Sequence, residues 1–396
     1  MLVAMVCGPF VTALSAQARP SSASGFAALT ARANAARDSD QLDQAVALYK
    51  RALLLRPQWT EGWWSLGTIQ YDRNHYADAA RAFQKVLQQA PQQGTAQLMF
   101  GLCEQELGND KVALQEIEKA KGQMLAADPQ LLHVLLYHDG VLLRRAGRFE
   151  GAQESLGELC AENVQSKESV QELGMVALRI RAKGPVTGPD AEVVQQVGQA
   201  SCLSAQKKFA DARQLFGSIV QAHPDFPGIH YAYGKFLLDA SDTPAAIGQF
   251  KEEIKQDPRD VVARLQIAAA EYRADSASGL PYAEEAVTLA PQLPFAHYLL
   301  GLLLLDMGNF QKAIPQLEIA EHAFPKETKL YFALSSAYAG AGRMKDAAQA
   351  RARFAQLQKE QANRPQMEGA AVAPPSASQQ TLGREVGAPG PQSPGP

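Results

Sequence analysis

The sequence predicts an all-α chain built from stacked pairs of helices. One unit of 34 residues has two apolar faces at helical period, and key residues of this unit recur at the same spacing along the chain. The composition also suits helices, since charged residues make up 20% and aromatic residues 7% of the 396 residues. A fixed period of this length is typical of a solenoid, in which each repeat contacts only its neighbours.

Residues 60–93 form the clearest unit. In each half, apolar residues recur at three- and four-residue steps, which predicts one buried face per helix. Gly67 and Ala79 let the two helices approach closely, and Phe83 fills the space beside them. Neither face can be buried alone. Because Ala79 lies where the two helices approach closely, a larger residue there is expected to overpack the crossing and cost about 1–3 kcal/mol of stability.

The unit recurs at a spacing of 34 residues. Residues separated by this distance are Pro57 and Pro91, Gly67 and Gly101, Ala79 and Ala113, Ala212 and Ala246, Phe216 and Phe250, Pro224 and Pro258, Pro291 and Pro325, Gly308 and Gly342, and Ala313 and Ala347. Within one unit the chain carries Trp63, Leu66, Gly67, Ala79, Phe83 and Pro91, with Tyr71 one place late. This pattern resembles that of the tetratricopeptide repeat family. The resemblance implies a right-handed superhelical solenoid of helix-turn-helix repeats, whose first helices line a concave groove.

Residues 1–18 have the pattern of a secretory signal peptide. The chain is apolar from Leu2 to Leu14, and Ala16-Gln17-Ala18 predicts cleavage after Ala18. The apolar run is too short, and too broken at Gly8-Pro9, to span a bilayer as a mature helix. No Lys or Arg precedes it, so an upstream start, a weak signal and a cytoplasmic chain with an apolar N-terminus are the alternatives.

Two repeat arrays are expected, at residues 26–183 and 190–361. Between them lies a Pro- and Gly-rich stretch, residues 183–189, which is expected to be non-helical. The helical pattern at residues 169–181 belongs either to a damaged repeat or to an extra helix. Residues 362–396 are rich in Pro, Gly, Ala, Ser and Gln, so they are expected to be disordered and to serve as a linker, a docking peptide or an inert tail.

Removal of the leader leaves Cys103, Cys160 and Cys202, an odd number without close spacing. A disulfide framework is therefore not expected, and at least one thiol stays unpaired within the chain. Each cysteine falls in a predicted helix, where a small buried hydrophobic residue is favoured over a redox or metal role. A Cys160–Cys202 bridge requires the fold to bring the two together.

Sequence motifs for catalysis or metal binding are not found. The chain has no Gly-x-Ser-x-Gly elbow, no phosphate-binding glycine loop, no His-Glu-x2-His and no Cys-x2-Cys. The net charge of −3 gives no basic footprint for nucleic acid. His230 and His297 fall two repeats apart, so they are expected to pack half-buried and not to share a metal. We therefore expect no cofactor, no metal and no nucleic-acid partner.

The candidate partner-binding residues are those that the resemblance places in the groove. The residues four places after the start of units two to nine are Trp64, Leu98, Tyr137, Val197, Tyr231, Leu265, Tyr298 and Phe332. Aromatic anchors of this kind suit extended peptides or helices, and packing against the neighbouring helix is an equal alternative. The basic groove candidates are Arg144, Arg145 and Lys235. Family members that bind a C-terminal carboxylate use Lys and Asn at defined first-helix positions. The matching positions here hold apolar or small residues, so a carboxylate clamp is not expected.

These observations favour a non-enzymatic protein-protein interaction scaffold that is periplasmic or secreted. It would bind a peptide or protein segment in the concave groove, with no stable membrane span in the mature chain. One alternative is an envelope enzyme or enzyme subunit whose site the repeats carry. Another is a structural component of an envelope complex. Repeat scaffolds serve many systems, so the sequence does not name the partner.

Overall fold

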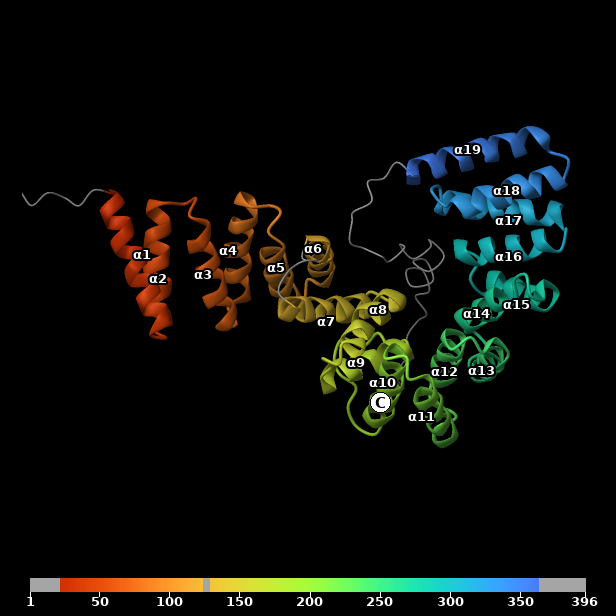
Figure 1. The fold of residues 1–396 in the computed structure, drawn as a ribbon, viewed down its shortest axis with the longest axis horizontal. Helices are drawn as coiled ribbons and strands as arrows, with labels where there is room; N and C mark the ends of the chain where they lie inside the picture. Colours follow the sequence, from red (N-terminus) through yellow and green to blue (C-terminus); the bar gives the residue numbers. More distant parts are fainter. Residues whose placement is uncertain (1–21, 124–128, 363–396) are drawn as a thin grey trace, which may run out of the picture. The chain divides into compact units, whose positions relative to one another are not determined.

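The computed structural model describes residues 22–123 and 129–362 (Figure 1). This part of the chain is 79% helical and contains 19 helices and no strands, which confirms the predicted all-α class. The expected signal peptide at residues 1–18 lies outside the described residues, and so does all but the first residue of the expected tail at residues 362–396.

The chain divides into two compact units, Met1–Ala126 and Ala127–Pro396. The described helices of the first unit are α1 (Ser22–Asp38), α2 (Leu42–Leu55), α3 (Thr60–Asp72), α4 (Tyr76–Gln89), α5 (Gly94–Glu106) and α6 (Asp110–Gln123). Those of the second unit are α7 (Pro129–Arg145), α8 (Phe149–Ala161), α9 (Lys167–Ala177), α10 (Asp190–Ala205), α11 (Phe209–Ala222), α12 (Ile229–Asp239), α13 (Thr243–Gln256), α14 (Val261–Glu271), α15 (Ser276–Leu289), α16 (Pro294–Asp306), α17 (Phe310–Ala323), α18 (Thr328–Gly340) and α19 (Met344–Ala362).

Within a pair, a glycine of the first helix packs against a large side chain of the second. A Cβ atom added at Gly67 would lie 2.8 Å from Phe83, and one added at Gly234 would lie 2.7 Å from Phe250. The same contact recurs between Gly101 and Ile117, Gly140 and Leu156, and Gly301 and Leu317. Carbon atoms do not approach so closely, so glycine sets the spacing of the two helices. The predicted close approach at Gly67 is confirmed.

The turn after the first helix of a pair contains a residue with positive φ. These residues are Asp40, Asn74, Gly108, Gly147, Arg179, Lys207, Ser241, Arg273, Gly308 and Gly342. Arg179 follows α9, and a residue with positive φ, Asn163, also follows the second helix α8. The connector, residues 178–189, then leads to α10, which packs closely against α9. The helix expected at residues 169–181 is therefore an extra helix before α10, and it ends earlier than predicted, at Ala177.

Residues 183–189, where the break between two repeat arrays is expected, form a loop inside the second compact unit. The helices on its two sides are α9 and α10, whose backbones touch. A Cβ atom added at Gly174 would overlap the carbonyl oxygen of Val194, and one at Gly198 would overlap that of Val170. Proline and glycine end a helix, but they do not end the packing of the helices that they join.

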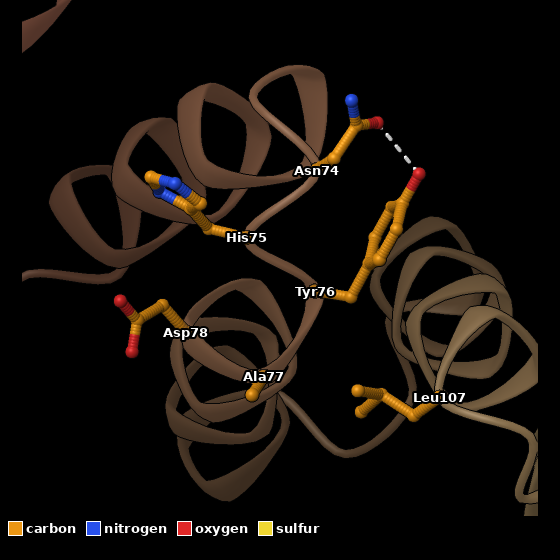
Figure 2. Close-up of a pocket in the computed structure, with 6 residues that line it drawn as sticks. All are labelled: Asn74, His75, Tyr76, Ala77, Asp78 and Leu107. Atoms are coloured by element: carbon orange, nitrogen blue, oxygen red, sulfur yellow. Dashed lines mark hydrogen bonds between the residues drawn. The ribbon is translucent and has the colours of Figure 1, made fainter.

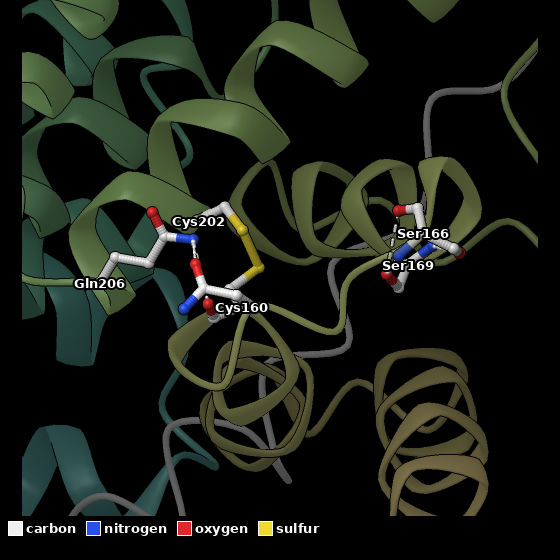
Figure 3. Close-up of a disulfide and its surroundings, with 6 residues drawn as sticks. Cys160, Ser166, Ser169, Cys202 and Gln206 are labelled. Carbon is white, nitrogen blue, oxygen red and sulfur yellow. Dashed lines mark hydrogen bonds between the residues drawn. A yellow bond between two sulfur atoms is a disulfide. The ribbon is translucent and has the colours of Figure 1, made fainter. Parts of the chain in front are cut away.

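A disulfide between Cys160 and Cys202 joins α8 to α10 (Figure 3). Gln206 reinforces this connection, since its Nε2 donates to the carbonyl oxygen of Cys160 at 3.0 Å. The N-terminus of α9 is closed by a capping box in which Ser166 and Ser169 bind each other's backbone N–H groups. Cys160 and Cys202 are thus buried as a disulfide, while Cys103 is a buried free thiol.

An alanine of the second helix completes the contact within each pair. Ala79, Ala113, Ala246 and Ala313 have no exposed surface. Substitution of Ala79 by Leu is expected to lower the free energy of unfolding by about 1–3 kcal/mol, because the added carbons have no space between α3 and α4. Urea denaturation followed by circular dichroism measures this change.

The control is Ala77→Leu on the same helix, because Ala77 is exposed. This substitution should change stability by less than about 0.5 kcal/mol. Equal losses in the two variants would contradict a tight contact at Ala79.

Candidate functional site

The two groove candidates of the first unit differ in accessibility. Trp64 on α3 is half-buried, and its ring meets that of Phe83 edge-on with centroids 5.4 Å apart. Leu98 on α5 is only 1% exposed. Trp64 therefore retains accessible apolar surface, whereas Leu98 is a core residue.

Two tyrosines of the second unit are packed in the core. Tyr231 is 5% exposed and lies against Phe250, and Tyr298 is 7% exposed and lies against Phe324. Burial raises the pKa of both phenols above the ordinary value. The other two core positions of this series, Val197 and Leu265, have no exposed surface. At these positions the packing alternative holds, because the neighbouring helices cover the side chains.

Tyr137 and Phe332 remain accessible. Tyr137 on α7 is half-buried beside His138, with ring centroids 5.1 Å apart, and burial raises the pKa of its phenol. Phe332 on α18 is 54% exposed and lies beside Phe354, with centroids 5.8 Å apart. Together with Trp64, these rings are the accessible aromatic members of the predicted set.

Arg144 does not face a partner, which corrects its placement in the groove. Its side chain has no exposed surface. Nε donates to Glu172 at 2.7 Å, and Nη1 donates to the carbonyl oxygens of Ile180 at 2.9 Å and Ala182 at 2.7 Å. A buried guanidinium needs a counter-charge and acceptors, and this one finds both inside its own unit.

The other two basic candidates are half-buried. Nη2 of Arg145 donates to the carbonyl oxygen of Lys183 at 3.0 Å, so Arg145 also holds the connector. Lys235 on α12 keeps part of its side chain accessible. Of the three, Lys235 is the candidate whose charge is not used to hold the connector, so it is the one that could meet a partner on the first-helix face.

A recurring hydrogen bond was missed by the sequence reasoning. A polar side chain near the start of each of five first helices binds the carbonyl oxygen of the proline six residues earlier. The bonds join Trp63 to Pro57, Gln97 to Pro91, His230 to Pro224, His297 to Pro291 and Tyr331 to Pro325. A carbonyl oxygen only accepts, so four residue types perform one task as donors. The fixed spacing from each proline is the signal that could have revealed it.

This bond gives the two histidines a structural role. His230 is 7% exposed and His297 is 6% exposed, so both are more deeply buried than predicted. In each, Nε2 binds the prolyl oxygen and Nδ1 binds a glutamine, Gln249 or Gln316. With both ring nitrogens occupied, neither ring is free to bind a metal or to transfer a proton.

Replacement of His297 tests this role. His297→Gln should preserve stability to within about 0.5 kcal/mol, because Gln97 makes the same bond in the first unit. His297→Leu should lower the free energy of unfolding by about 1 kcal/mol, because the bond to Pro291 is lost. Urea denaturation of the full chain measures both.

The control is His223→Leu, since His223 is exposed just after α11 and should tolerate the change. If His297→Gln proved as destabilising as His297→Leu, packing and not the hydrogen bond would account for the histidine.

A shallow hollow of about 380 Å³ in the first unit is lined by Asn74, His75, Tyr76, Ala77, Asp78 and Leu107 (Figure 2). Its polar groups bind one another or nearby residues. Oη of Tyr76 donates to Asn74 at 2.6 Å, Nδ1 of His75 bonds to Gln70 at 2.9 Å, and Asp78 pairs with Arg81. We assign no ligand to this hollow.

Other reactive groups were sought in the described ranges, 22–123 and 129–362. No three His, Cys, Asp or Glu side chains there gather closely enough to hold a metal ion. Burial raises the pKa of the Cys103 thiol to about 12, so this thiol stays protonated at neutral pH. None of the described helices has the length and apolar character of a membrane span.

The helix pairs and the contacts between them define a helical-repeat solenoid. A sequence profile of the family described as Tetratricopeptide repeat matches residues 30–94, 65–130, 198–261 and 298–365, which together make up more than half of the chain. The chain belongs to the tetratricopeptide repeat family, as the sequence motifs predicted.

Among solved structures, a crystal structure of MamA matches with 21% identity and a TM-score of 0.39, covering 42% of this chain and 97% of that one. A structure of MamA from residue 41 onward, from Desulfovibrio magneticus RS-1, matches with 21% identity and a TM-score of 0.41, covering 44% of this chain and 99% of that one. A comparison with curated protein sequences gave no match.

Proposed function

We propose that this protein is an exported scaffold that binds a segment of another protein on the first-helix face of its repeats and has no catalytic activity of its own. Tetratricopeptide repeats support a protein-interaction scaffold. The proposal adds the binding face, the compartment and the absence of catalysis.

The accessible aromatic rings carry the proposal for the binding face. Phe332 exposes 54% of its surface, although most residues at equivalent positions are buried. Trp64 and Tyr137 keep part of their rings accessible at the same place in their repeats. Rigid aromatic rings supply large contact area at low entropic cost, so they are common binding anchors.

The occupation of the histidines supports the proposal of no catalysis. His230 and His297 bind backbone and amide groups through both ring nitrogens. His133 forms a hydrogen bond of 2.8 Å with Glu162, and burial followed by the charge of Arg145 lowers the pKa of His138 to about 4. These four rings serve the fold, so none of them is available for acid–base chemistry near neutral pH.

Photo-crosslinking tests the binding face. A crosslinking amino acid placed at Trp64, Tyr137 or Phe332 of the full chain is expected to capture the same partner in the source cell. The matched controls are Lys85 and Lys312, which are exposed on the second helices α4 and α17. These positions should capture that partner much less. Equal capture at control and ring positions, or no capture at any ring position, would contradict the proposal.

Two features support export. The first 18 residues have the pattern of a signal peptide, and Cys160 and Cys202 form a disulfide in the folded chain. Disulfides persist chiefly in oxidising compartments such as the periplasm or the extracellular space. The two features come from different parts of the chain and point to the same side of the membrane.

Mass spectrometry of the protein from its source cell tests export. The mature chain is expected to begin at Arg19, because cleavage is predicted after Ala18, and to carry Cys160 and Cys202 as a disulfide. An intact leader together with a free Cys160 thiol in the cytoplasmic fraction would contradict export.

A further inference from the structure

The connector between α9 and α10, residues 178–189, is fixed by hydrogen bonds from buried and half-buried side chains to its backbone carbonyl oxygens. Arg144 donates to the carbonyl oxygens of Ile180 and Ala182, and Arg145 donates to that of Lys183. Nε2 of Gln171 donates to the carbonyl oxygen of Val186 at 2.9 Å. The side chains of Ile180 and Val186 pack against the core of the second unit. The connector is therefore a fixed surface strip, although its sequence is that of a flexible loop.

Three cationic residues lie at alternate positions of the connector, namely Arg179, Arg181 and Lys183. Arg181 and Lys183 are exposed, and Arg179 is half-buried. The guanidinium of Arg179 lies 5.3 Å from the ring centre of Phe149 and 5.1 Å from that of Tyr231. This placement over two rings limits its motion.

The guanidinium of Arg181 lies against the turn between α7 and α8, because a Cβ atom added at Gly147 would lie 3.3 Å from Arg181 Cζ. Gly147 has φ of +76° in this turn, so both the space and the backbone conformation suit glycine. The guanidinium thus lies beside this turn, on a side chain that is exposed.

The positive charge of the strip is not neutralised within the described chain. None of the three cations forms an ion pair there, and Glu172 is already paired with the buried Arg144 at 2.7 Å. Besides burial, the charge of Glu150 raises the pKa of Tyr231, over whose ring Arg179 lies, yet Glu150 forms no ion pair with Arg179. Three neighbouring like charges repel one another, and a partner with negative charge would remove this repulsion.

We infer that residues 179–183 form a docking strip for a carboxylate-rich segment of a protein partner. The inference rests on the proposed scaffold function and specifies the chemistry of the partner. Arginine binds carboxylates in bidentate geometry, and the fixed backbone presents its cations without further loss of backbone entropy.

The charge distribution favours an acidic protein segment over a polyanion. Nucleic acids and anionic membranes are bound by broad basic surfaces, usually with more cations than this strip has. Here the whole chain has a net charge of −3 and a pI of about 6.2. Three cations on a strip of five residues match the charge and length of a short acidic segment better than those of a long polyanion.

Fluorescence anisotropy with a short labelled peptide of alternating Glu and Ser tests the inference on the full chain. Arg181→Glu with Lys183→Glu should weaken binding by about tenfold or more at low salt, because attraction becomes repulsion. The neutral pair Arg181→Gln with Lys183→Gln should have an intermediate effect, and it serves if the reversal variant does not fold.

The matched control is Lys251→Glu with Arg259→Glu, two exposed cations of the second unit that make no ion pair in the described chain. It changes the net charge equally and should weaken binding by less than about twofold. Equal weakening by both reversals would show a net-charge effect and overturn the inference. Binding of an oligonucleotide or of anionic phospholipid vesicles that is tighter than that of the peptide, and is lost in the strip variant, would overturn it too.

The crosslinking experiment separates this inference from the proposed function. If the ring positions capture a partner equally well in the wild-type chain and the Arg181→Glu, Lys183→Glu variant, the docking strip is wrong and the scaffold stands. If no ring position captures a partner, the first-helix binding face is wrong. The peptide titration then decides the docking strip by itself.

Discussion

The close contact of the two helices in a pair, which in five described pairs is made by a glycine against a large side chain, is the constraint on which the rest of this structure depends. It brings the two helices close enough for the alanine of the second helix to be fully buried, as at Gly67, Phe83 and Ala79. One pair still leaves an apolar face uncovered, and the next pair covers it. The stability of each pair therefore depends on its neighbours, and each added pair covers the apolar face of the one before it.

This modularity explains how the second unit accommodates the extra helix α9. Reciprocal glycine contacts seat α9 against α10, and the disulfide joins α8 to α10 across it. The buried Arg144 holds the connector that follows. The surface that results differs from that of a regular repeat, and it carries the three cations of the docking strip.

The helix pairs could be predicted from the sequence because their signal is local and periodic. The exposure of the aromatic positions could not, because Tyr231 and Phe332 occupy the same place in their repeats and differ only in what covers them. The role of Arg144 depends on Glu172 and on carbonyl groups further along the chain, so sequence spacing gives no sign of it. The disulfide likewise depends on how α9 is accommodated, since its cysteines are 42 residues apart. The proline-binding side chains were predictable in principle, because their spacing is constant.

The most direct test is the folding of one helix pair in isolation. A peptide of α16 and α17, residues 294–323, contains the Gly301–Leu317 contact but lacks the neighbours that cover its outer faces. Circular dichroism should find it largely unfolded under conditions in which the full chain is folded, because one pair cannot bury both faces. A stable peptide that unfolds cooperatively on heating would contradict the dependence of each pair on its neighbours.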